Sequence, residues 1–155
     1  MKKGTSGFTI VELLIVIAII GILATIGTLG FSRTQTMTRD AQRSSKSTVI
    51  AEALEKYYDK NGEYPSCNTL TRTPAVVTST TLIGMNPEAL TVPTAASGTN
   101  SLTCTSLTTA SADGFAYIGD TSTTCSTGVA CLGFTLQYEE ESTGTIISVS
   151  SRRHA

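Results

Sequence analysis

The chain has 155 residues, a formal net charge of −1 and a mean hydropathy of +0.11. This length fits one domain with an appended segment, and the near-neutral charge gives no reason to expect a specific nucleic acid as a partner. With no Trp and one His, the core has to rest largely on aliphatic side chains.

Residues 6–27, SGFTIVELLIVIAIIGILATIG, are nearly all apolar but include one carboxylate, Glu12. The 18 residues from Leu13 to Gly30 carry no charge. At about 1.5 Å per residue such a helix spans roughly 27 Å, close to the hydrocarbon thickness of a bilayer. We therefore predict a membrane-spanning helix. The presence of Glu12 in this segment requires an explanation, because a charge at the centre of a membrane helix costs about 2.5–3.5 kcal/mol.

Three interpretations of this segment compete. A cleaved secretory signal needs an apolar stretch of about 7–15 residues followed by an A-x-A-like site, but the run here is longer and no such site follows Ala24. An ordinary anchor helix explains the length but not the carboxylate. Cleavage between Gly7 and Phe8 explains both, because it creates an amine on Phe8 four residues before Glu12, on the same helix face.

Cleavage after Gly7 would provide a cationic partner for the carboxylate of Glu12. It can meet the Phe8 amine of a neighbouring copy as the helices stack, and any other register leaves both charges unpaired in an apolar bundle. An acid near a helix N-terminus is also favoured by the helix dipole. We expect Gly7 and Phe8 to be the processing site and Glu12 to act in assembly.

The stretch GFTIVELLIVIAIIGILA resembles the N-terminal signature, or class III signal, of type IV pilins and pseudopilins. Gly7 matches the residue before the cut, Phe8 the first mature residue and Glu12 the fifth. The resemblance implies that a membrane-embedded prepilin peptidase removes a leader, residues 1–7, and methylates the new amine. It also implies an inner-membrane assembly platform and a motor ATPase complex as partners.

The sequence departs from many pilins at Leu29, where they carry a proline, and it contains no proline before residue 65. Gly21, Gly27 and Gly30 each lower helix propensity by about 1 kcal/mol relative to Ala. These glycines permit either local melting of the helix or close helix packing, and the sequence leaves both open.

One helix is predicted from about Phe8 to Asn61. Residues 8–31 form its transmembrane and filament-core half, and residues 32–61 its extramembrane half. Beyond the apolar segment, a stripe recurs at spacings of three and four, made by Val49, Ile50, Ala53, Leu54, Tyr57 and Tyr58. Gly62 follows the expected end of the helix and Pro65 blocks its continuation. The segment LEKYYDKNGEYPS is similar to the one that closes this helix in many pilins.

Residues 62–155 are expected to form a globular head domain. Residues 67–112 show no strong period and are predicted to be a long loop with one small element. Alternating apolar residues predict strands at 132–138, around 147–149 and at 114–119. The fold class is therefore α+β, with a small antiparallel sheet on the second half of the helix. The resemblance to pilins implies the same arrangement.

All four cysteines, Cys67, Cys104, Cys125 and Cys131, follow the apolar segment. Their even number indicates an oxidising compartment and two disulfides, and their spacing is poor for zinc. Cys125 and Cys131 bracket five residues and can close locally, which favours Cys67–Cys104 as the other pair. Four cysteines allow three pairings, and the sequence does not choose among them.

No catalytic constellation is found, so we expect no enzyme and no cofactor. His154 has no partner in the tail, and the many serines lack a G-x-S-x-G context. The run Glu139–Glu141, with Asp113 and Asp120, invites comparison with the calcium loop of major pseudopilins. The EF-hand spacing is missing, so we interpret the run as a solvated acidic turn and expect no metal.

These observations predict a structural subunit of a type IV pilus. The precursor resides in the inner membrane, is cleaved after Gly7 and polymerises with copies of itself into a cell-surface filament for adhesion, twitching motility or DNA uptake. One alternative is a pseudopilin of a type II secretion system, and another is a membrane-tethered binding module that never polymerises. Four cysteines, a long Ser/Thr-rich loop and no evident calcium motif favour the pilin.

Overall fold

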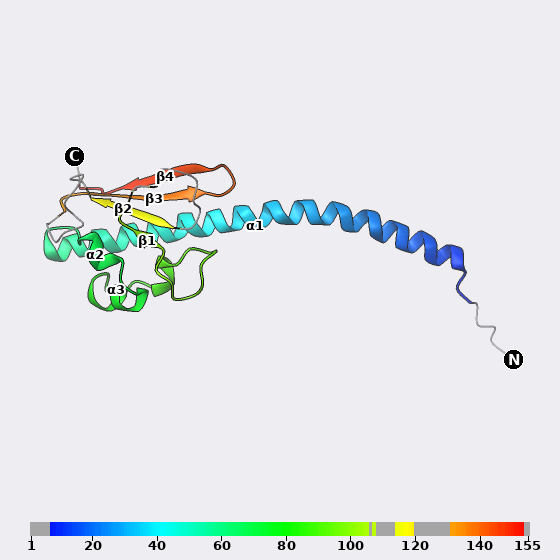
Figure 1. Ribbon diagram of the computed structural model, residues 1–155, viewed down its shortest axis with the longest axis horizontal. Helices are drawn as coiled ribbons and strands as arrows, with labels where there is room; N and C mark the ends of the chain where they lie inside the picture. Colours follow the sequence, from blue (N-terminus) through cyan, green and yellow to red (C-terminus); the bar gives the residue numbers. More distant parts are fainter. Residues whose placement is uncertain (1–6, 106, 108–113, 120–130, 154–155) are drawn as a thin grey trace. The chain divides into compact units, whose positions relative to one another are not determined.

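The computed structural model describes residues 7–105, 107, 114–119 and 131–153, without the side chains of residues 26–30. The chain divides into two compact units, Met1–Thr36 and Met37–Ala155. The long helix α1, Ile10–Asn61, contributes its first part to one unit and its second part to the other (Figure 1). This matches the single long helix that the sequence predicts.

In the first unit, α1 passes through Gly21, Gly27 and Gly30 without a break. Of the two outcomes that these glycines permit, the structure therefore shows no melting of the helix backbone. Within the described part of the chain, no helix combines the length and the apolar character that crossing a membrane requires. The membrane span predicted for residues 8–31 is thus not shown by the structure.

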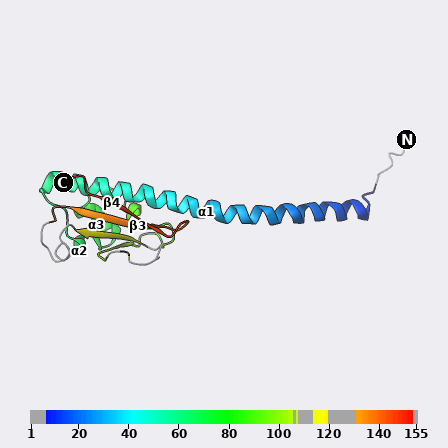
Figure 2. The same cartoon turned by 90° about the horizontal axis from the view of Figure 1, so that it is seen from above.

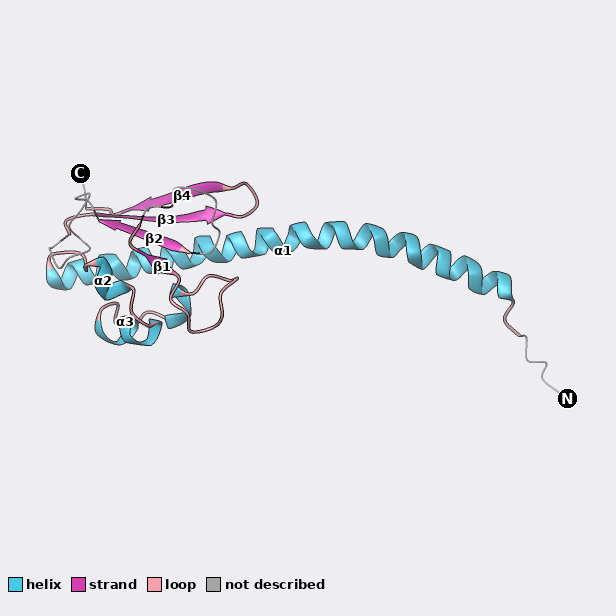
Figure 3. Cartoon of the chain, viewed as in Figure 1, coloured by secondary structure: helices cyan, strands magenta, loops and turns pink. Residues whose placement is uncertain are grey.

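The second unit holds a four-stranded sheet in the order β1-β2-β3-β4 (Figure 3). Its strands are β1 (Leu102–Thr103), β2 (Phe115–Gly119), β3 (Phe134–Glu140) and β4 (Thr145–Ser150). The pairs β2–β3 and β3–β4 are antiparallel, which confirms the predicted sheet. The short β1 was not predicted, and it pairs with β2 in parallel.

The core of this unit lies between the sheet and the second part of α1, which run side by side in both views (Figures 1 and 2). On β3, Phe134, Leu136 and Tyr138 are buried, as their alternation predicts. They join Ile50 and Leu54 of α1 in one apolar cluster. Tyr57 and Tyr58 pack against the same cluster, which agrees with their expected role in packing.

The segment predicted as a long loop contains more regular structure than expected. It forms two short helices, α2 (Cys67–Leu70) and α3 (Pro74–Thr80), and a 3₁₀ turn, η1 (Pro87–Leu90). A proline opens both α3 and η1, where its fixed φ and missing N–H fit a first helical turn. Elements of four to seven residues are too short to show a hydrophobic period, which is why the sequence pattern missed them.

A disulfide joins Cys67, at the start of α2, to Cys104, just after β1, with a Cα–Cα distance of 5.7 Å. The two cysteines are 37 positions apart in the sequence, and a cross-link of this kind typically stabilises a fold by about 2–4 kcal/mol. Cys131 is also disulfide-bonded. The predicted partner of Cys131, Cys125, lies outside the described residues.

Candidate functional site

The predicted processing site lies just before the first helix. Gly7, Phe8 and Thr9 are not helical, and α1 begins at Ile10. Both Gly7 and Phe8 are exposed, with 77% of Phe8 accessible. A Cβ atom added at Gly7 would meet nothing within 4 Å. Packing among the described residues therefore imposes no requirement for glycine at this position.

Thr9 and Glu12 form a reciprocal cap at the start of α1. The backbone N–H of Thr9 donates to Glu12 Oε2 at 2.9 Å, and the backbone N–H of Glu12 donates to Thr9 Oγ1 at 3.3 Å. The Thr9 hydroxyl also donates to Glu12 Oε2 at 2.7 Å. This is a capping box, and it satisfies two of the backbone donors that every helix N-terminus leaves unpaired.

This capping role of Glu12 was not predicted from the sequence. The signal was present, because a Thr followed three residues later by a Glu before an apolar run marks a helix N-terminus. In the single chain, then, the carboxylate of Glu12 has local hydrogen-bond partners. Its predicted pairing with the Phe8 amine of another copy is not tested by a structure of one chain.

The first unit exposes apolar side chains on all sides of its helix between Ile10 and Leu23. From Phe8 to Leu23, the large apolar side chains are between 44% and 82% exposed. Soluble single proteins rarely expose contiguous apolar surface on this scale, and such surfaces mark sites of interaction with proteins or membranes. The exposed apolar helix and the carboxylate at its start form the first candidate site.

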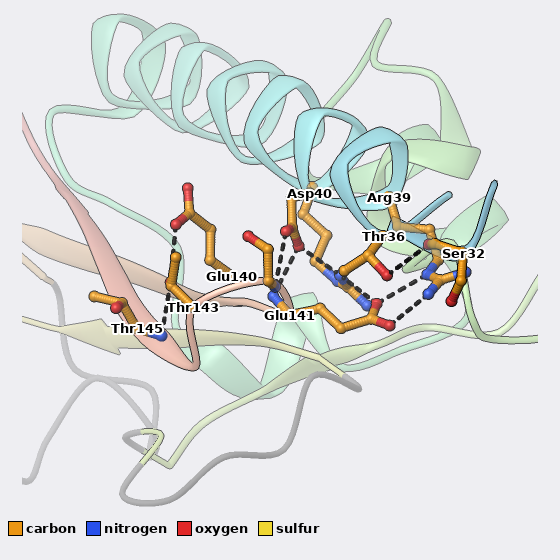
Figure 4. Close-up of polar contacts among 10 residues, drawn as sticks. Ser32, Thr36, Arg39, Asp40, Glu140, Glu141, Thr143 and Thr145 are labelled. Atoms are coloured by element: carbon orange, nitrogen blue, oxygen red, sulfur yellow. Dashed lines mark hydrogen bonds and ion pairs between the residues drawn. The ribbon is translucent and has the colours of Figure 1, made fainter. Parts of the chain in front are cut away.

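In the second unit, a cluster of charged side chains anchors the β3–β4 turn to α1 (Figure 4). The Asp40 carboxylate accepts the backbone N–H groups of Glu141 at 2.8 Å and Ser142 at 3.0 Å. Arg39 donates to both oxygens of Glu141. Arg43 pairs with Asp40 at 3.1 Å and with Glu141 at 3.2 Å. Three residues of one helix face thus hold the turn in place.

Burial and hydrogen bonding set the charge states of this cluster. Burial raises the pKa of Asp40, but hydrogen bonds from Ser142 and Glu141 and the charge of Arg43 outweigh it, so the pKa lies below its usual value. The hydrogen bond from Arg39, with that from Arg43, lowers the pKa of Glu141. Both carboxylates are therefore ionised at neutral pH.

Arg43 is fully buried, and its Nε and Nη2 atoms find no hydrogen-bond partner among the described residues. A buried charge is expensive unless it is paired, so its pairing with Asp40 and Glu141 is the condition for tolerating it. Loss of either carboxylate would leave the guanidinium without enough compensation.

The solvated acidic turn predicted for Glu139–Glu141 is corrected by this geometry. Glu139 is only 4% exposed, and Glu141 is held by two arginines of α1. Sequence reasoning failed here because Arg39 lies 102 residues from Glu141. Among the described residues, no group of three or more His, Cys, Asp or Glu side chains is arranged to hold a metal ion.

Arg152 and Arg153, which follow β4, contact the C-terminal end of α1. Arg153 pairs with Asp59, lies 3.6 Å from Glu55 Oε2 and stands over the ring of Tyr58 at 5.3 Å. The neighbouring backbone N–H of Arg152 donates to Glu55 Oε1 at 2.9 Å. These contacts hold Arg152 and Arg153 against the helix.

Tyr64 connects this end of α1 to the sheet. Its hydroxyl donates to Glu55 Oε2 at 3.0 Å, and its ring packs edge-on against Phe134 at a centroid distance of 5.0 Å. Burial, together with the hydrogen bond to Glu55 and its charge, raises the pKa of Tyr64 to about 12. The Tyr64 hydroxyl therefore keeps its proton and donates a hydrogen bond to the Glu55 carboxylate across the physiological pH range.

Comparison with known proteins places the N-terminal segment in a recognised class. Residues 2–28 match the model of the prokaryotic N-terminal methylation motif. The match contains Gly7, Phe8 and Glu12, which the sequence singled out.

Two curated relatives are fimbrial proteins of Neisseria meningitidis. The protein of serogroup A is 42% identical and that of serogroup B is 41% identical, each over 73 residues. In both comparisons the aligned part covers 44% of this chain and 41% of the relative. The chain thus spans about two fifths of the length of these relatives. No solved structure gives a significant match.

The N-terminal segment of this chain thus carries the prokaryotic N-terminal methylation motif, and 44% of the chain is similar to part of two fimbrial proteins.

Proposed function

We propose that this chain is a structural subunit of a type IV pilus, without catalytic activity of its own. A prepilin peptidase cleaves the precursor after Gly7 at the inner membrane and methylates the amine of Phe8. The mature chain then polymerises through residues 8–31 into a helical filament on the cell surface. Residues 62–155 face outward in this filament.

The exposed apolar helix of the first unit is the observation that carries this proposal. The large apolar side chains of Phe8 and of α1 from Ile10 to Leu23 are not covered by other described residues of the chain. In a bundle of identical helices they cover one another. Lipid and bundle are similarly apolar, so the net gain comes from close packing and from the pairing of polar groups.

Glu12 supplies the polar pair in this assembly. In the single chain its carboxylate caps the helix through Thr9. After cleavage, the amine of Phe8 in a neighbouring copy is the cation that this carboxylate meets. This pair fixes the register of neighbouring helices, because shifting one helix along the other separates two charges that are costly to leave unpaired in an apolar environment.

The partners in this process are proposed from the resemblance to type IV pilins. They are the prepilin peptidase, an inner-membrane assembly platform and a motor ATPase complex that extracts subunits for polymerisation. The relatives are named fimbrial proteins, which supports a filament as the product.

Mass spectrometry of fibres sheared from producing cells tests the proposal. We expect the fibres to contain this chain with the mass of a polypeptide that begins at Phe8 and carries one methyl group. Fibres that retain the leader of residues 1–7, or cells whose surface fibres lack this chain, would contradict the proposed function. Electron microscopy of the same cells distinguishes long fibres from short periplasmic assemblies.

A further inference from the structure

The second unit has a groove along the far end of α1 that the proposed function leaves without a role. Two adjoining hollows, of about 210 and 270 Å³, lie between α1 and residues 80–86, and they share Ala53, Lys56 and Ile83 in their walls. Ile83 is 67% exposed and Val49 39%, so the walls include uncovered apolar surface. We call this the Lys56–Lys60 groove.

The groove carries a local positive charge. Lys56 and Lys60 stand one helical turn apart and both line it, whereas Glu52 is the single carboxylate among its lining residues. Within the described part of the chain, neither lysine forms an ion pair. Two ammonium groups beside exposed apolar surface favour an acidic partner.

The opposite end of the same unit carries a surface of opposite charge. The β3–β4 turn projects there, with Ser142, Thr143 and Gly144 exposed. Glu140 is half-buried beside it, and its carboxylate accepts only the hydroxyl of Thr143 at 3.0 Å among the described contacts. Glu140 therefore keeps a negative charge that no cation of the described residues neutralises.

The two surfaces are separated along the helix. Asp40 fixes the β3–β4 turn beside its own position on α1. Lys56 and Lys60 follow 16 and 20 residues later, which places them about 24–30 Å further along an α-helix. The turn therefore lies where the chain enters the second unit, and the groove lies where α1 ends.

We propose that the Lys56–Lys60 groove of one copy receives the β3–β4 turn of the next copy, with Glu140 facing the two lysines. The inference rests on the proposed polymer. In a parallel array with each copy shifted along the axis, the entry end of one unit faces the far end of its neighbour. Complementary patches at opposite ends make a heterologous contact, and such contacts generate open helical filaments.

A zero-length carbodiimide cross-linker applied to sheared fibres tests this contact. It joins a lysine to a carboxylate only when the two groups touch. We expect mass spectrometry to find Lys56 or Lys60 joined to Glu140. The separation of about 24 Å or more within one chain excludes an intramolecular link between Glu140 and either lysine. A Lys56 or Lys60 cross-link to a carboxylate of another protein, or none at all, would overturn the inference.

Charge-reversal substitutions give a second, independent test of the contact. We expect Lys56→Glu with Lys60→Glu, or Glu140→Lys alone, to lower fibre yield about fivefold at low salt, since each places like charges together. The three substitutions combined should restore the fibre yield. Added salt should reduce the difference in yield between each variant and the wild type, because it screens the charges. Arg72→Glu is the matched control, because Arg72 is exposed outside the groove, and it should leave the yield unchanged.

The outcomes separate the inference from the function on which it rests. If wild-type fibres contain the chain but the lysine reversal behaves like Arg72→Glu, the contact is wrong and the pilus function stands. If no fibre contains the chain, the proposed function fails and the contact fails with it.

Discussion

The backbone N–H of Glu141, in the β3–β4 turn, donates to the carboxylate of Asp40 on α1 at 2.8 Å across 101 residues of sequence. A second backbone donor, from Ser142, reaches the other oxygen of the same carboxylate. One buried side chain thus caps a turn from a distance and holds the sheet to the helix. The buried guanidinium of Arg43 depends on the same carboxylate.

Replacing Asp40 should therefore destabilise the second unit strongly. We expect Asp40→Ala to lower the free energy of unfolding by about 3 kcal/mol, because it leaves two turn N–H groups unpaired and a buried arginine undercompensated. Urea unfolding of the intact chain in a mild detergent measures this change. Ser45→Ala, at an exposed position on α1, is the control and should change stability by less than about 0.5 kcal/mol. Equal midpoints for the two variants would show that the clamp contributes nothing.

Stability should fall in acid through the same two carboxylates. The pKa values of Asp40 and Glu141 lie below their ordinary values of 3.8 and 4.5. The unfolded chain therefore binds more protons than the folded chain in this range. Their contribution is complete above about pH 5 and is lost as the pH falls through the ordinary values toward the lower folded-state values. Urea midpoints between pH 6 and pH 3 should fall less for Asp40→Asn than for the wild type; parallel curves would refute this.

The C-terminal fastening predicts a smaller effect. Arg153 is half-exposed, so its contacts with Glu55, Asp59 and Tyr58 are screened by solvent. We expect Arg153→Ala to lower the free energy of unfolding by about 1 kcal/mol. Arg152→Ala is the matched control, because Arg152 holds Glu55 through its backbone N–H, which the substitution retains. A loss of stability in Arg152→Ala as large as in Arg153→Ala would contradict the assignment.

Substitution of Gly7 tests the processing site without disturbing the fold. A side chain at position 7 meets no neighbour in the chain, so Gly7→Val should fold normally. We expect the peptidase to leave this variant uncut, with the leader of residues 1–7 retained in the mass spectrum. Thr5→Val, inside the leader, is the control and should be processed. A mature mass for Gly7→Val would place the cut elsewhere.

Two substitutions of Glu12 separate its capping role from its charge. Glu12→Gln can keep the capping hydrogen bonds with Thr9, because glutamine also serves in a capping box. Glu12→Val loses both the cap and the charge. Pairing with the Phe8 amine requires the charge, and an unpaired ion in an apolar bundle costs about 3–5 kcal/mol.

We therefore expect both Glu12 variants to be cleaved but to give fibre yields at least about tenfold lower, measured on sheared material. A normal yield from Glu12→Gln with a reduced yield from Glu12→Val would assign Glu12 to helix capping alone. Normal yields from both would remove Glu12 from assembly.

Features that depend only on residues close together in the chain could be predicted from the sequence. The helix over Ile10–Asn61 follows from the apolar stripe and from Gly62 and Pro65 at its end, and the strand Phe134–Glu140 follows from alternation. The N-terminal signature also lies within a short segment, and the methylation motif matches it. The capping box could also have been predicted from the sequence, because Thr9 and Glu12 are three residues apart.

Other features depend on contacts between residues that are far apart in the chain. The acidic run at 139–141 has the composition of a solvated turn, and only contacts with a helix about 100 residues away show that it is an anchor. The parallel pairing of β1 with β2 and the short helices between Cys67 and Leu90 are likewise fixed by packing and by the Cys67–Cys104 bond. Short elements have too few residues for a period, and side chains distant in sequence become partners only when the chain folds.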